Sequence, residues 1–130
     1  MIDANDAITK LYNQLCETQD QYATLFAKVK DTEFGDVIST ILSRRKDNIA
    51  ELRVYLCIKR TDVTDAPRSD AVAVSSPLEL VANERRILAA YDKAIAPISG
   101  RHEKFDFLVA QHKWLQSFVA NLSDALSINA

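Results

Sequence analysis

Apolar residues recur along the chain at alternating steps of three and four, the spacing that gathers side chains on one face of an α-helix. Four such stretches can be traced. They run from Ile8 to Val29, from Phe34 to Leu56, from Val81 to Ile95 and from Phe105 to Leu126. The chain contains only 2 Gly and 3 Pro, which leaves few breaks within these stretches. The pattern therefore predicts an all-α protein of four packed helices.

One long connection separates the second and third predicted helices. Residues 59–77 have no helical period and are rich in Ser, Asp and Thr, and Ser76, Pro77 and Glu79 mark the start of the third helix as a capping box. The second helix would be about 39 Å long, and the extended connection could span about 60 Å. We therefore expect a crossover that makes the second and third helices parallel, the ferritin-like arrangement. A simple up-down-up-down bundle is the alternative.

Composition and charge place the chain among ordinary globular proteins. Residues 1–130 are expected to form a single domain, with 48% hydrophobic and 26% charged residues. The net charge of −2 argues against binding to nucleic acid, which requires a basic excess on one face. No apolar run approaches a membrane span, and the acidic start lacks the features of a signal peptide. We expect a cytoplasmic protein with no membrane or nucleic-acid partner.

Two cysteines, Cys16 and Cys57, are far apart in the sequence and form no CxxC pair. Each falls beside an apolar helical stripe, where a free Cys behaves as a small hydrophobic residue. A disulfide between them is geometrically possible, but a reducing compartment disfavours it. We expect two buried free thiols.

Polar residues interrupt all four apolar stripes at a similar distance from the short turns. His112 stands in the last stripe where a Leu would serve, and Glu84 interrupts the third. Arg45 interrupts the second stripe, and Thr18, with Glu17 beside it, interrupts the first. These five residues are predicted to form a polar layer in the core. The plain alternatives are a core histidine held by one hydrogen bond and a glutamate that reaches solvent.

Several short segments resemble ferritin-like bacterial proteins of unknown function. They are Leu15–Thr18, the turn at Val29–Asp31, the Arg44–Arg45 step and the stretch from Asn83 to Tyr91. The resemblance extends over most of residues 4–126. It implies a four-helix bundle whose middle could once have held metal.

Residue by residue, the resemblance matches Glu17 to the first-helix carboxylate, Glu84 to the third-helix carboxylate and His112 to the fourth-helix imidazole. The departures are larger than the matches. Arg45 stands where the second helix would carry a Glu, and Val109 stands three residues before His112 where the fourth would carry another. A two-metal site needs about four carboxylates to balance its charge. We therefore expect no metal and no cofactor, and an Arg45 side chain paired with Glu84 or Glu17.

A second stripe on the last helix consists of Phe107, Trp114 and Phe118. It lies about 100° around the helix from the apolar stripe that runs from Phe105 to Leu126. Either residues 71–74 of the connection cover these rings, or they form an interface between subunits, where Trp and Phe are enriched. No catalytic constellation is found. The sequence therefore favours a non-enzymatic bundle, expected as a homodimer or with a protein partner. The alternatives are a residual metal site of Glu17, Glu84 and His112, or a carrier of a small apolar ligand.

Overall fold

The fold consists of four long helices. The computed structural model describes residues 4–58, 74, 76–98 and 105–125. Its elements are α1 (Ala4–Val29), α2 (Glu33–Ile58), α3 (Pro77–Ile95), a 3₁₀ turn η1 (Ala96–Ile98) and α4 (Asp106–Ala125). The predicted all-α bundle of four helices is confirmed.

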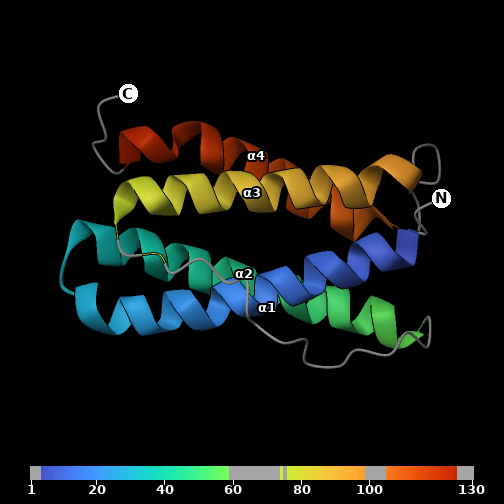
Figure 1. Cartoon of the computed structure of the whole chain (residues 1–130), viewed down its shortest axis with the longest axis horizontal. Coiled ribbons are helices and arrows are strands. Elements are labelled where there is room, and N and C mark those ends of the chain that lie inside the picture. The colour runs from blue at the N-terminus through green and yellow to red at the C-terminus, as the bar shows by residue number, and fades with distance from the viewer. Residues whose placement is uncertain (1–3, 59–73, 75, 99–104, 126–130) are drawn as a thin grey trace.

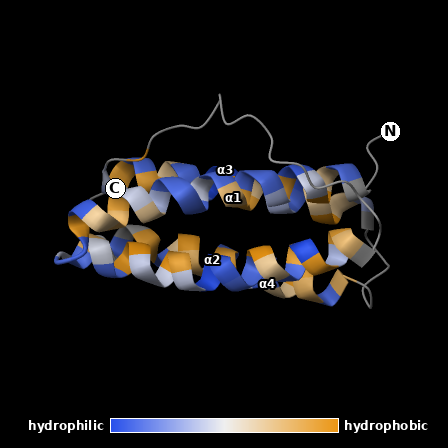
Figure 2. Ribbon diagram, turned by 90° about the horizontal axis from the view of Figure 1, so that it is seen from below, coloured by the Kyte–Doolittle hydropathy of each residue, from blue (hydrophilic) through white to orange (hydrophobic). Residues whose placement is uncertain are grey.

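The helices lie in two layers, α1 with α3 and α2 with α4 (Figure 2). α2 and α3 run in the same direction, whereas α1 and α4 run in the opposite one (Figure 1). Side-chain packing agrees with this, because Leu80 near the start of α3 shares a buried cluster with Ile38 near the start of α2. The crossover expected at 59–77 lies outside the described residues apart from Val74, Ser76 and Pro77.

Two apolar clusters fill the interior, one toward each end of the bundle. One cluster, near the turn between α1 and α2, includes Tyr22, Ile41 and Leu80. The other, toward the opposite end, is built around Leu15, Leu52 and other buried residues of all four helices. The first predicted stripe proved accurate, since its positions are buried up to Leu25 and half-buried at Val29. The buried ones are Ile8, Leu11, Leu15, Thr18, Tyr22 and Leu25. Arg45 and Glu84, described below, lie between the two clusters along α2 and α3.

The ends of the helices explain where the chain turns. Ser76 caps α3, because its hydroxyl accepts a hydrogen bond from the backbone N–H of Glu79 at 3.2 Å, and Pro77 follows it. Asp31 is a residue type that commonly caps helices, but the cap of α2 is provided by Thr32, whose hydroxyl accepts a hydrogen bond from the N–H of Gly35 at 3.0 Å. A side chain at Gly35 would collide with the backbone carbonyl oxygen of Val29.

The two thiols differ from the expectation in their exposure. Neither is in a disulfide, and Cys16 is half-buried. Cys57 is exposed, because the buried positions at this end of α2 are Tyr55 and Leu56. Among the described residues, no helix combines the length and the apolar character needed to cross a membrane.

Candidate functional site

A buried ion pair lies at the middle of the bundle. Arg45 of α2 is 1% exposed and Glu84 of α3 is fully buried. The guanidinium donates from Nη2 to Glu84 Oε1 at 2.5 Å and from Nη1 to Oε2 at 3.3 Å. This two-pronged geometry is the strongest form of pairing available to an arginine and a carboxylate. The partner expected for Arg45 is therefore present in the form of Glu84.

Tyr22 of α1 provides a further hydrogen bond to the Glu84 carboxylate. Its hydroxyl donates to Glu84 Oε2 at 2.6 Å and accepts from Asn83 Nδ2 at 2.8 Å. Both residues are buried. Three helices thus contribute to one network in which the glutamate receives three hydrogen bonds, so that its charge is balanced and its lone pairs are engaged.

The network shifts the protonation equilibria of its members. Burial acts to lower the pKa of Arg45, but the charge of Glu84 and its hydrogen bonds outweigh burial, and the pKa of Arg45 is raised. Burial, together with the charge of Glu84, raises the pKa of Tyr22 well above its usual value. The guanidinium is therefore a fixed cation, and the phenol remains a neutral donor.

A second polar group lies beside the first. The hydroxyl of Tyr91 on α3 donates to Gln111 Oε1 of α4 at 2.6 Å. The amide of Gln111 in turn donates to the backbone carbonyl of Asn48 at 3.3 Å and to Glu51 Oε1 at 3.1 Å, both on α2. Burial is also the main cause that raises the pKa of Tyr91, which the charge of Arg45 partly offsets. The polar layer therefore reaches α4 through Gln111.

His112 does not lie in this layer, contrary to the sequence prediction. Its side chain is 19% exposed, and its Nε2 lies 2.7 Å from Oδ1 of the exposed Asp92. The buried residue of α4 at this level is Gln111. Steps of three and four permit either position after Leu108, and the core takes the path through Gln111 to Leu115.

The first-helix positions are divided in the same way. Thr18 is buried, but its hydroxyl donates to the carbonyl of Leu15 in its own helix at 3.0 Å. Glu17 is only half-buried, because successive residues of a helix point about 100° apart and Thr18 is the one that faces the core. Of the five predicted layer residues, the structure joins only Arg45 and Glu84.

Sequence reasoning missed the tyrosines and the side-chain amides of the two polar groups. Tyr22 and Tyr91 stood in the apolar stripes and were counted as core, although a buried phenol needs a hydrogen-bond partner. Asn83 and Gln111 each adjoin a residue that the sequence singled out, Glu84 and His112. The available signal was the pair of tyrosines at seam positions, which indicated polar partners nearby.

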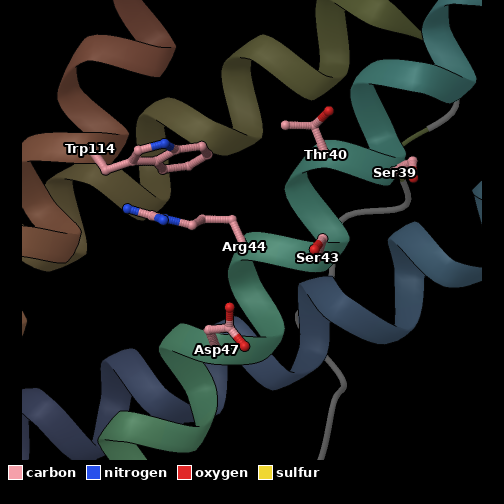
Figure 3. A pocket seen from close by; sticks show the side chains of 6 residues that line it. All are labelled: Ser39, Thr40, Ser43, Arg44, Asp47 and Trp114. Atoms are coloured by element: carbon pink, nitrogen blue, oxygen red, sulfur yellow. The ribbon is translucent and has the colours of Figure 1, made fainter.

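The aromatic stripe on α4 lies at the seam with α2. Phe107, Trp114 and Phe118 are each half-buried. The rings of Trp114 and Phe118 are stacked with their centroids 4.8 Å apart, and the guanidinium of Arg44 lies 5.0 Å from the centroid of Trp114. Figure 3 shows Arg44 extending from α2 beneath the indole. α2 itself therefore covers part of these rings.

Shallow depressions follow this same seam. One, of about 480 Å³, is lined by Trp114 together with hydroxyl and charged side chains of α2, including Arg44 and Asp47 (Figure 3). A neighbouring one of about 220 Å³ shares Arg44 and Asp47 and continues to Ala110 and Gln111. The seam thus presents half-buried aromatic rings beside charges of both signs.

A metal centre is not assembled within the described ranges, where no three His, Cys, Asp or Glu side chains are grouped closely enough to hold an ion. Glu84 is engaged by Arg45 and Tyr22, whereas His112 faces Asp92. The arrangement can hold the helices in register and bury a fixed charge. Comparison of the chain with family models, curated proteins and solved structures finds no match.

Proposed function

We propose that this chain is a ferritin-like helical bundle that works without metal, performs no reaction itself and acts by associating with a second copy. The parallel course of α2 and α3 supports the ferritin-like part of the proposal, since that arrangement requires one long crossover. The 18 residues between Ile58 and Pro77 are long enough to provide it.

The observation that carries the proposal is the position of the Arg45 guanidinium. Di-iron bundles direct carboxylates and histidines from four helices into the middle of the bundle, where the metal supplies the positive charge. Here, a permanently charged guanidinium provides that charge to Glu84 at 2.5 Å. The carboxylate therefore has a cation that cannot dissociate.

The alternative of a residual metal site is less well supported. Its proposed ligands were Glu17, Glu84 and His112, which do not form one group. Glu84 would have to leave Arg45, and a buried guanidinium without its partner is costly. His112 would have to leave Asp92 and turn toward the interior.

The α2–α4 seam supports association with a second copy. Twofold-symmetric dimers bring the same patch of each subunit together, so the patch must complement itself. Arg44 and Asp47 lie on successive turns of α2 at the edge of the aromatic rings. In an antiparallel contact, the Arg44 of one copy can meet the Asp47 of the other while Trp114 packs at the centre.

Sedimentation velocity over a range of concentrations tests this proposal. We expect a dimer at tens of micromolar and a monomer for Ala110→Arg, which adds bulk and charge to the seam without removing any packing. Trp114→Ala should also weaken the dimer, whereas Leu78→Ala, which truncates an exposed apolar side chain of α3, should not. Circular dichroism checks the fold of each variant. A monomeric parent, or a dimer indifferent to Ala110→Arg, contradicts the proposal, as does association only with a different protein.

A further inference from the structure

A groove of about 730 Å³ runs between α1 and α3, on the side of the bundle opposite the α2–α4 seam. Its lining extends from Arg86 of α3 to Pro97 of the following η1 turn, and on α1 from Ala7 to Gln14. Eleven helical steps correspond to a length of about 16 Å. None of its lining residues belongs to the Arg45 network.

The apolar part of this groove is made mainly of small side chains. Ala7 and Leu11 of α1 line one side of it. The other side is lined by two alanines of α3 and two small residues of η1: Ala89, Ala90, Ala96 and Pro97. Alanine methyl groups are apolar but too short to fill the space between two helix backbones. They therefore leave a trough in which an apolar chain would be removed from water on most sides.

Three cations border the trough, in a protein whose net charge is −2. Lys10 stands on the α1 wall, and Arg86 and Lys93 stand on the α3 wall. All three are exposed, and no lining residue is a carboxylate. Within the described part of the chain, none of the three is in an ion pair. The groove thus combines an apolar trough with unneutralised positive charge on both walls.

We propose that this groove binds a single-chain amphiphile with an anionic head, the chemical class of medium- and long-chain fatty acids. The tail lies along the alanines, and the carboxylate is held by the flexible cations, whose own methylene stems pack against the tail. An extended chain of about a dozen carbons is about 15 Å long, at about 1.3 Å per bond. It matches the length of the groove.

The head and tail are tested separately with dodecanoate below its micelle concentration, by calorimetry and by amide chemical-shift changes. We expect binding at one site, with chemical-shift changes confined to α1, α3 and the η1 turn. Dodecyltrimethylammonium has the same tail and the opposite charge, and it should bind at least about tenfold more weakly. Arg86→Glu should weaken dodecanoate binding, whereas Arg85→Glu, its exposed neighbour outside the groove, should not.

A second pair of variants tests the trough itself. Ala89→Trp fills the groove and should reduce dodecanoate affinity by about tenfold or more. Ala82→Trp places the same side chain two turns earlier on the exposed face of α3, outside the groove, and should leave affinity unchanged. Absence of dodecanoate binding, equal binding of the cationic amphiphile or indifference to Ala89→Trp would overturn the inference. Binding only to phosphatidylglycerol vesicles, or only to an acidic helical peptide, would overturn it as well.

Discussion

Two adjacent arginines of α2 have opposite environments. Arg45 is buried against Glu84, whereas Arg44 is exposed and lies over Trp114. An unpaired charge in a helical interior is destabilising by several kcal/mol, but exposed cation–π contacts contribute only about 0.5–1 kcal/mol. Substitutions of Arg44 and Arg45 can therefore be compared directly, because the two residues differ mainly in their burial.

We expect Arg45→Ala to lower the free energy of unfolding by about 3–5 kcal/mol, because it leaves the Glu84 carboxylate buried without its cation. Arg44→Ala should lower it by about 1 kcal/mol or less. Replacing Arg45 and Glu84 together by Leu and Met should cost far less than Arg45→Ala alone. Chemical denaturation measures all three. Equal stability of the Arg45→Ala protein and the parent would contradict a buried pair.

The raised pKa of Tyr22 predicts that the free energy of unfolding decreases in alkaline solution. Its pKa is raised by burial and by Glu84 above the ordinary value of 10.0, so the folded protein retains a proton that the unfolded chain releases. Its contribution is complete below pH 10 and is lost as the pH rises further, by up to about 1.4 kcal/mol per pH unit. Thermal unfolding between pH 9 and 11, run on the parent and on Tyr22→Phe, measures this. The variant should show the shallower decline, and parallel curves would refute the assignment.

At the scale of the elements, helix rotation is where sequence reasoning lost accuracy. The first stripe was predicted nearly position by position, because a single path of steps of three and four leads from Ile8 through Thr18 to Leu25. On α4 the paths through Gln111 and His112 are both polar, and periodicity alone cannot choose between them. The choice depends on the Tyr91 hydroxyl of α3, which lies 20 residues away and needs a partner.

The turn between α1 and α2 gives a prediction of its own. Gly35 looks like a mild irregularity in the sequence, but a Cβ there would meet the backbone of Val29 and Lys30. Gly35→Ala must move backbone, and we expect it to destabilise the bundle by about 1–3 kcal/mol. Ser39→Ala, one turn later and exposed, should change stability by less than about 0.5 kcal/mol. If Gly35→Ala destabilises no more than Ser39→Ala in thermal melts, the close approach of Gly35 to the backbone of Val29 is contradicted.

At the scale of the whole molecule, four apolar stripes were sufficient to predict a four-helix bundle. The candidate site was predicted only in part. Arg45 and Glu84 could be found as polar interruptions of apolar stripes, and a charged pair follows from the cost of burying either residue alone. The grooves could not be found, because they depend on which short and charged side chains two antiparallel helices bring together.

The central claim is that the Arg45 guanidinium supplies the positive charge that a metal supplies in a di-iron bundle. Elemental analysis of protein purified without added metal, combined with thermal melts with and without a chelator, tests it most directly. We expect no stoichiometric iron, manganese or zinc, and one melting temperature in both conditions, because Glu84 already holds Arg45 and Tyr22. A stoichiometric metal that is lost on Glu84→Gln, with a melting temperature that falls on chelation, would contradict the claim.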